Sequence, residues 1–308
     1  MANLLSVRDN ENLTLTLLVK NISAIQSDAG IYQKVLLRDQ DGNERTAMKF
    51  DSLLDYNPPC LVNATIKGGD YLRLVSCEAA DGAVEDYLPH AEIDVKAYWS
   101  EFNSYMRMIR PGLARICCYI AANYRNDFIN RPLKVKGAFA RTSGLFEATV
   151  KLMRLAVNVA PVVSADTDLC VAAAALAYIG DLKSVNTGFA ISKTSVLISE
   201  GARSYAVFSA AVNDLMENDA AREDIEQEDL DSLGHAILTR GRYAMPLTLE
   251  AEVIRDLDLL VKGTEERRES MKGSASGSMV EAPGYRDINY YNYKAPAPVN
   301  HEAGDSNE

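Results

Sequence analysis

The spacing of apolar residues changes once along this chain, and that change predicts two domains of different kinds. Between residues 13 and 78, "LTLTLLVKNISAIQ" and the segments after it alternate apolar with polar residues or run through β-branched ones. Asp-Gly and Gly-Gly-Asp turns divide them into five short strands. Five strands with tight turns are typical of a small barrel, most often of the oligonucleotide-binding (OB) type. We predict an OB-type barrel over residues 1–80, with a nondescript five-stranded sheet as the alternative.

From residue 93 the apolar residues follow the helical period. Val95, Trp99, Phe102 and Met106 recur behind Asp94, a helix-capping residue type. The pattern continues without strand signals, so residues 93–272 are predicted to form an all-α domain, joined to the barrel by a linker at 81–92. The predicted fold class is therefore α+β and multidomain. Further helices are expected at 143–160, 165–179, 193–218, 221–239 and 247–270.

Composition changes again at Gly273. The stretch "GSASGSMVEAPG" has the chemistry of a flexible linker, which predicts a flexible tail over residues 273–308. Disordered tails are usually poor in aromatic residues, yet four tyrosines cluster here. They indicate a docking peptide for a partner protein or a neighbouring subunit, or else an uninvolved tail. The four are Tyr285, Tyr290, Tyr291 and Tyr293.

The barrel carries aromatic residues that suit a nucleic-acid ligand. Tyr32, Phe50 and Tyr71 fall in or beside the predicted strands. On single-strand-binding barrels such rings stack with successive bases. The alternative is that they are half-buried strand aromatics with a packing role.

Beyond the barrel, short motifs follow one another in an order that points to a known family. The linker "VEDYLPHAEI" leads to "AFARTSGLFEATVKLMRLA", then to "LAYIGDLK", "HAILTRGRY" and "PLTLEAEVIRDLD". In order and spacing the chain resembles the YhaM-type 3′→5′ exoribonucleases, which join an OB domain to a metal-dependent HD phosphohydrolase domain. The resemblance covers residues 13–262 and includes Gly144, Glu147, Thr149 and Gly180.

The resemblance implies a metal site whose ligands this chain has mostly lost. HD enzymes hold one or two divalent metals with His and Asp side chains, and the metals generate a nucleophilic hydroxide. The signature His-Asp pair falls on Ala177 and Tyr178, and neither side chain is a good ligand at neutral pH. The other ligand positions fall on Ala138 and Phe139, Ala148, the neighbourhood of Ala206, and Arg240 with Gly241, while only His235 and Asp258 keep the family residue.

We therefore expect a degenerate HD domain with no catalytic residue, no bound metal and no other cofactor. The alternative is a rebuilt magnesium site made only of carboxylates, from Glu147, Asp181 and Asp258. No Ser-His-Asp, Cys-His or phosphate-loop motif suggests a different chemistry.

Basic residues surround the positions of the lost ligands. Residues 91–160 carry 11 Lys and Arg against 5 Asp and Glu, although the whole chain has a net charge of −11. A guanidinium can hold a phosphate without a metal and without hydrolysing it. We hypothesise a phosphate or nucleic-acid cradle, with scattered surface cations as the alternative. Its candidate residues are Arg131, Lys134, Lys136, Arg141, Arg240 and Arg242.

The composition indicates the cellular location to expect for this protein. No apolar run approaches the about 18–20 residues of a membrane span, so no membrane contact is expected. The start of the chain lacks the basic and apolar regions of a signal peptide. The five cysteines have no C-x-x-C spacing, which favours small buried hydrophobes in a reducing cytoplasm.

Three functions follow as hypotheses. The first is a catalytically inactive HD pseudoenzyme that binds single-stranded RNA or DNA, or serves as scaffold in a nucleoprotein assembly. The second is a protein-interaction or structural oligomer with no nucleic-acid role, which the acidic net charge favours. The third is a residual 3′→5′ exonuclease or phosphohydrolase with a metal at His235 and Asp258. The family resemblance also implies a homo-oligomer.

Overall fold

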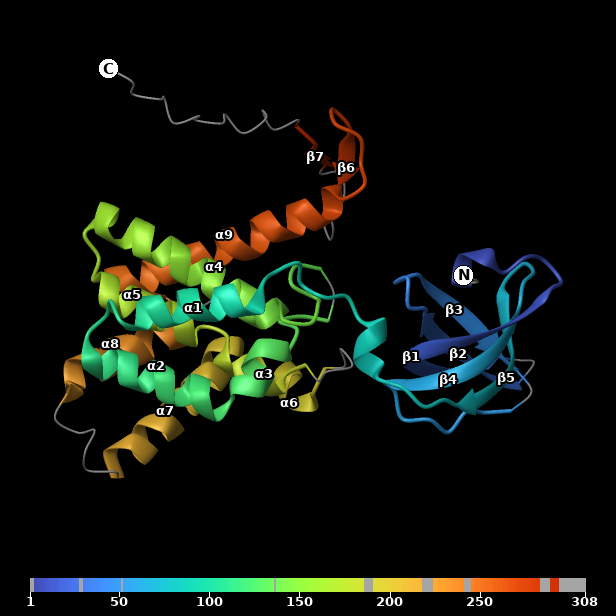
Figure 1. Ribbon diagram of the computed structural model, residues 1–308, viewed down its shortest axis with the longest axis horizontal. Coiled ribbons are helices and arrows are strands. Elements are labelled where there is room, and N and C mark those ends of the chain that lie inside the picture. The colour runs from blue at the N-terminus through green and yellow to red at the C-terminus, as the bar shows by residue number, and fades with distance from the viewer. Residues whose placement is uncertain are drawn as a thin grey trace, which may run out of the picture.

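The computed structural model describes residues 3–27, 30–50, 52–135, 137–185, 191–217, 224–240, 245–282 and 289–293. It has a β-barrel at one side, a helical domain at the other, and a small two-stranded sheet beyond the last helix (Figure 1). The α+β architecture predicted from the change of period is confirmed.

Five strands close the N-terminal barrel in the order β1-β2-β3-β5-β4. All neighbours are antiparallel except β3 and β5, which run parallel. The strands are β1 Asn12–Ser27, β2 Gly30–Arg38, β3 Glu44–Lys49, β4 Cys60–Lys67 and β5 Leu72–Ala79. The short 3-10 helix η1, Leu4–Ser6, adds the buried side chain of Leu4 to the barrel core.

The run "LLV" in β1 explains how the barrel meets the rest of the chain. Successive strand residues face opposite sides of a sheet. Leu17 and Val19 therefore point into the barrel core, and Leu18 points outward. Leu18 is nevertheless fully buried, because Tyr87 and Leu88 of the linker pack over it. A strand that is apolar on both faces thus marks the domain junction.

Nine helices make up the helical domain within the described residues. Their bounds are α1 Val95–Met106, α2 Pro111–Asn123, α3 Arg125–Asn130, α4 Gly144–Val159, α5 Thr167–Leu176, α6 Lys193–Leu197, α7 Glu200–Glu217, α8 Gln227–Leu238 and α9 Leu249–Met271. The 3-10 turns are η2 Val84–Tyr87 in the linker, η3 Ala160–Val163 after α4, and η4 Ile179–Lys183 after α5. None of the described helices is both long enough and apolar enough to cross a membrane.

Helix α5 is the centre of this domain. Every residue from Leu169 to Leu176 is buried, and the helix contacts α2, α4, α8 and α9. A helix that is apolar on all sides can only be stable inside a protein. Its position explains the alanine-rich sequence, because small side chains let four neighbouring helices approach.

Several predicted boundaries were wrong. The helix expected at 165–179 ends at Leu176 and continues as η4, and the one expected at 193–218 is two helices, α6 and α7. The segment expected to be a flexible linker from Gly273 contains strand β6, Met279–Glu281, which pairs with β7, Asn289–Tyr291. The Nδ2 atom of Asn292 donates to the Oγ of Ser274 at 2.8 Å, which ties this hairpin to the end of α9.

Candidate functional site

Three aromatic rings form a continuous row on the barrel surface. Tyr32 lies in β2, Phe50 directly follows β3, and Tyr71 directly precedes β5. The ring centroids of Tyr32 and Phe50 are 5.5 Å apart with planes at 30°, and those of Phe50 and Tyr71 are 5.7 Å apart. Phe50 is 40% exposed and Tyr71 52% exposed. The structure thus brings together all three rings that the sequence analysis singled out.

A cation completes this row. The guanidinium carbon of Arg73 lies 5.7 Å from the centroid of the Phe50 ring, within the range of a cation–π contact. Arg73 was missed in the sequence analysis, although Tyr71 and Arg73 are two residues apart and so share one face of a strand. We call Tyr32, Phe50, Tyr71 and Arg73 the aromatic face of the barrel.

The phenol of Tyr178 lies at the end of α5, where the signature His-Asp pair of the HD family would fall. Tyr178 is fully buried, and its hydroxyl donates to Oδ1 of Asp258 at 2.5 Å. Lys262 donates to the other oxygen of Asp258 at 3.1 Å. Burial and the charge of Asp258 raise the pKa of Tyr178 well above its usual value. The residue is therefore a neutral hydrogen-bond donor and not a metal ligand.

Arg240 lies directly over this phenol. Its guanidinium carbon is 4.7 Å from the centroid of the Tyr178 ring, and its side chain is 1% exposed. Nη2 lies 3.6 Å from Oε2 of Glu200 and 4.0 Å from Oδ2 of Asp181. Burial alone would lower the pKa of Arg240, but the neighbouring carboxylates, that of Asp258 foremost, raise it. The guanidinium is therefore a permanent internal cation.

The positions around Arg240 and Tyr178 do not fit a metal. Among the described residues, no three His, Cys, Asp or Glu side chains are grouped closely enough to hold an ion. Asp181 is bound by Arg203, and Glu200 by Lys262. The ring of His235 is used in a different contact: its Nε2 accepts the backbone N–H of Leu247 at 2.8 Å.

The structure shows which residues near Ala206 face the interior. Ala206 is exposed on α7, and Arg203 and Ser204 face inward instead. Ser204 accepts the N–H of Gly180 at 3.1 Å and donates to the carbonyl of Ala177 at 2.9 Å. A Cβ on Gly180 would lie 2.2 Å from the backbone nitrogen of Ser204, so this close approach requires glycine. Ala148 is buried, and Gly241 lies outside the described residues.

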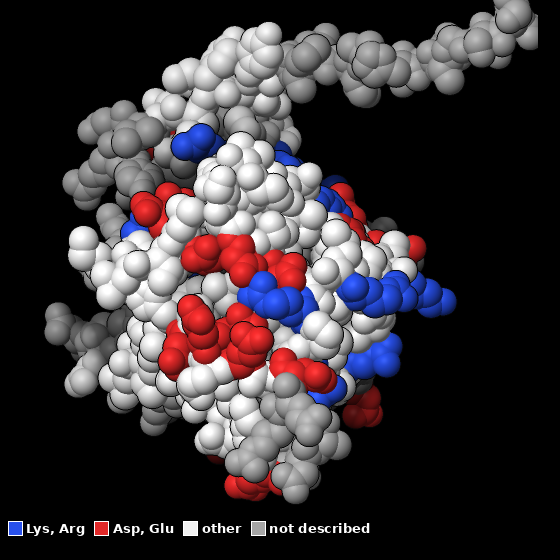
Figure 2. Space-filling view, turned by 90° about the vertical axis from the view of Figure 1, so that its left-hand side faces the viewer, with Lys and Arg blue, Asp and Glu red and all other residues white. Residues whose placement is uncertain are grey.

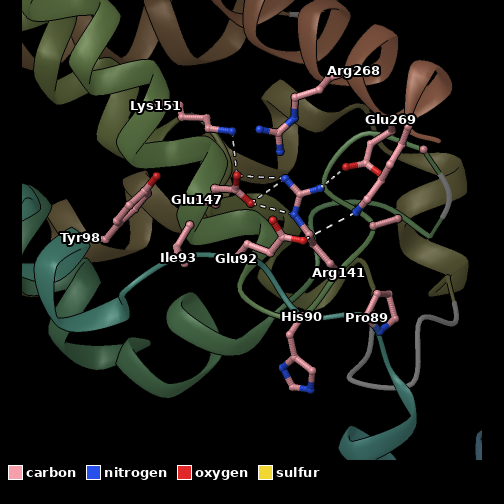
Figure 3. Close-up of a pocket in the computed structure, with 13 residues that line it drawn as sticks. Pro89, His90, Glu92, Ile93, Tyr98, Arg141, Glu147, Lys151, Arg268 and Glu269 are labelled. Carbon is pink, nitrogen blue, oxygen red and sulfur yellow. Dashed lines mark hydrogen bonds and ion pairs between the residues drawn. The ribbon is translucent and has the colours of Figure 1, made fainter. Parts of the chain in front are cut away.

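Arg141 belongs to a second, separate network, drawn in Figure 3. It donates to Glu147 at 2.8 and 2.9 Å, to Glu265 at 2.6 Å and to Glu269 at 2.9 Å. Lys151 donates to Glu147 and Glu265 as well. These side chains line part of a cavity of about 230 Å³ beside the linker. Because Glu147 is held here, it cannot join Asp181 and Asp258 in a carboxylate-only metal site.

The six cradle candidates differ in their surroundings. Arg141 and Arg240 are each held by their own set of carboxylates. Arg131 pairs with Asp127 at 3.0 Å. Lys134 is the cradle candidate that lines a groove next to Glu200 and Arg203. Lys136 and Arg242 lie outside the described residues.

The tyrosines of the tail differ in their surroundings. Tyr290 is half-buried, with the guanidinium of Arg267 5.3 Å from its ring centroid. Tyr291 and Tyr293 are 57% and 72% exposed, and their centroids are 6.4 Å apart. Tyr285 lies outside the described residues.

Comparison of the chain with protein-family models, with curated proteins and with solved structures found no match in any of the three. The resemblance to OB–HD exoribonucleases therefore stays a prediction.

Proposed function

We propose that this protein binds single-stranded nucleic acid through the aromatic face of its barrel and does not hydrolyse it. The observation that carries the proposal is the row of the half-buried Tyr32 and the exposed Phe50 and Tyr71, with Arg73 against Phe50. Base–aromatic stacking is tolerant of sequence, because every base presents a π-face. Unpaired bases have such faces free, and bases in a duplex do not.

The location of the row supports this ligand. OB barrels bind oligonucleotides on the face of strands 2 and 3 and on the loops after strands 1 and 4. Tyr32 begins this face in β2, Phe50 ends β3, and Tyr71 lies in the connection between β4 and β5. The three rings therefore lie where a barrel of this strand order offers a binding surface.

The acidic surface of the far helical end disfavours that end as the binding region. Figure 2 shows that Asp and Glu side chains gather on the helical end opposite the barrel, around a small number of basic ones. On the helical domain Arg110 is already paired with Asp166 at 2.8 Å and with Asp229 at 2.7 Å. A phosphate backbone would be repelled from an acidic surface.

The absence of hydrolysis is proposed from the side chains at the end of α5. The phenol of Tyr178 and the guanidinium of Arg240 occupy the positions that carry metal ligands in the family the chain resembles. Asp258, the surviving family aspartate, is bound by Tyr178 and Lys262. We propose the HD domain as a degenerate structural domain in this protein.

The test is titration of the full chain into labelled single-stranded RNA and DNA, followed by fluorescence anisotropy. Phe50→Ala should weaken binding by about 5- to 150-fold, the range of one base–aromatic stack. Tyr205→Ala, which removes a ring of α7 that is 38% exposed and lies outside the aromatic face, is the matched control and should leave affinity unchanged. Equal affinity of the Phe50→Ala and wild-type proteins would overturn the proposal.

Hydrolysis is tested on the same oligonucleotides with Mn²⁺ or Mg²⁺. We expect the strands to remain intact. Progressive shortening from the 3′ end, abolished by Asp258→Ala, would show instead that the residual exonuclease hypothesis is correct.

A second candidate function is supported by the hairpin of β6 and β7. Tyr291 and Tyr293 form an exposed aromatic pair on a two-stranded sheet, and exposed aromatic residues are enriched at protein interfaces. We propose this hairpin as a contact for a partner protein or a second copy of the chain. Light scattering should show a lower oligomeric mass for the Tyr291→Ser, Tyr293→Ser double variant if the contact joins copies of the chain.

A further inference from the structure

A groove of about 480 Å³ lies in the helical domain between the segment before α4, η4 and the start of α7. Its volume falls in the range of about 300–1,000 Å³ found for small-molecule sites. Leu133, Val185 and Val196 contribute apolar wall, and Glu200, Lys134 and Arg203 contribute charge. Asp181 lines the groove as well, and Arg203 binds it at 2.5 Å. The groove therefore has both apolar and charged side chains in its lining, which suits a planar ligand with a polar edge.

Glu200 is an ionised hydrogen-bond acceptor in this groove. Burial opposes its ionisation, but the charges of Lys262 and Arg240 outweigh it and lower the pKa of Glu200 to about 2. Both contacts use Oε2, with Lys262 at 3.0 Å and Arg240 at 3.6 Å. The Glu200 side chain is 45% exposed, and neither ion pair within the described residues uses Oε1, which leaves this oxygen facing a ligand.

Arg240 attracts the Glu200 carboxylate by its charge, without a hydrogen bond between the two side chains. Nε, Nη1 and Nη2 of Arg240 are buried and make no hydrogen bond to any of the residues that the structure describes. A buried guanidinium without hydrogen bonds is costly, so it is retained here for its charge. Lys134 adds a donor at the same rim, close enough for its charge to lower the pKa of Glu200 further.

We propose that this groove binds a guanine base. An ionised carboxylate can only accept hydrogen bonds, and guanine presents two adjacent N–H donors, at N1 and N2, beside the acceptor O6. Glu200 would accept from the donors, and Lys134 would donate to O6. Adenine and cytosine turn a ring-nitrogen lone pair toward the same carboxylate and would be repelled. The aliphatic side chains that line the groove suit the faces of a planar base.

The inference rests on the proposed function for its biological source, but its chemistry is separate from the barrel. The base can belong to a free guanosine nucleotide or to a guanine in the strand held by the aromatic face. Both sources present the same edge to Glu200.

The experiment is calorimetric titration of the full chain with GMP, AMP, CMP and UMP. GMP should bind at least about 5-fold more tightly than AMP, the lower limit of discrimination by a paired base edge. Glu200→Gln should abolish that preference, and Glu252→Gln, an exposed glutamate of α9 at 58% side-chain exposure, is its control. Equal affinities for the four nucleotides, or an unchanged preference in Glu200→Gln, would overturn the inference.

A second variant protects the test against a loss of folding. Val196 is 74% exposed, so Val196→Trp can fill the groove without disturbing the core. It should abolish GMP binding, and Val162→Trp, at a position 81% exposed on η3, should not. GMP binding that survives Val196→Trp would place the ligand elsewhere and overturn the assignment.

Oligonucleotides distinguish the sources and the two proposals. If the strand supplies the base, an oligoadenylate with one guanine should bind more tightly than GMP, and Phe50→Ala should weaken the oligonucleotide alone. If a free nucleotide supplies it, the added guanine should not improve strand binding. If the barrel variants bind the strand as tightly as the wild type while the preference for GMP is intact, only the proposed function is contradicted. Normal strand binding without guanine preference would contradict only the groove.

Discussion

The molecule contains the same kind of pair, an arginine against an aromatic ring, in two opposite settings. On the barrel, Arg73 lies 5.7 Å from the ring centroid of Phe50, which is 40% exposed. At the end of α5, Arg240 lies 4.7 Å from the ring centroid of Tyr178, which is fully buried. The first pair leaves a ring face for a ligand. The second is enclosed by carboxylates and holds the helical domain together.

The comparison shows that burial, and not residue type, decides what such a pair does. A buried cation requires charged partners, and Asp181, Glu200 and Asp258 supply them around Arg240. An exposed cation such as Arg73 is solvated by water as well. Side chains that look like a binding site in the sequence therefore become a structural network when they are enclosed.

The largest expected effect comes from breaking the buried network. Asp258→Ala leaves Lys262 and Arg240 without their shared carboxylate and Tyr178 without its acceptor. Removing one partner of a buried ion pair typically costs about 3–5 kcal/mol, and urea unfolding would measure it. Asp256→Ala, on the same helix at 60% side-chain exposure, should stay within about 0.5 kcal/mol. A similar small loss for Asp258→Ala would contradict the structural role of the network.

Tyr178→Phe sharpens the comparison by removing one hydroxyl and keeping the ring. The lost hydrogen bond goes to a charged acceptor, so the free energy of unfolding should fall by about 1.5–3 kcal/mol. Arg240 keeps its aromatic face in this variant. If the variant were as stable as the wild type, the ring alone would account for the retention of Tyr178.

Acid should weaken the same network through Glu200. Its pKa is lowered to about 2 in the folded protein by Lys262 and Arg240, from the ordinary value of 4.5 in the unfolded chain. A lowered carboxyl pKa stabilises the fold above the unfolded value and loses that contribution as pH falls toward the folded value. Stability measured by urea unfolding should therefore decline between about pH 5 and 2. The decline should be shallower in Glu200→Gln; an identical slope would assign the acid sensitivity to other carboxylates.

The smallest expected effect on stability is on the exposed side of the comparison. Phe50→Ala should change the free energy of unfolding by no more than about 0.5 kcal/mol, as for surface positions in general. The same variant is expected to lose strand affinity, so stability and binding should separate. A loss of several kcal/mol in thermal or urea unfolding would show that the aromatic face is a packing feature of the barrel.

Much of the fold follows from local patterns in the sequence. The strand period in residues 13–78, the turn residues and the later helical period predict a barrel followed by helices, because each pattern reflects burial on one face of one element. A helix boundary was predicted wrongly where α5 is followed by the 3-10 helix η4, which begins at Ile179. The ordered hairpin after Gly273 was missed because it depends on α9 for support.

For the candidate sites, the sequence by itself determined which side chains are present: three aromatic residues for a barrel surface, and cations where metal ligands were expected. Only the tertiary structure decided which charges meet. Tyr178 and Asp258 are 80 residues apart, and Arg141 and Glu265 are 124 apart. Such pairs leave no local periodicity, because they form only when helices from distant parts of the chain pack together. Burial then decides the role of each: it encloses Arg240 and Arg141 with carboxylates and leaves Phe50 and Arg73 at the surface.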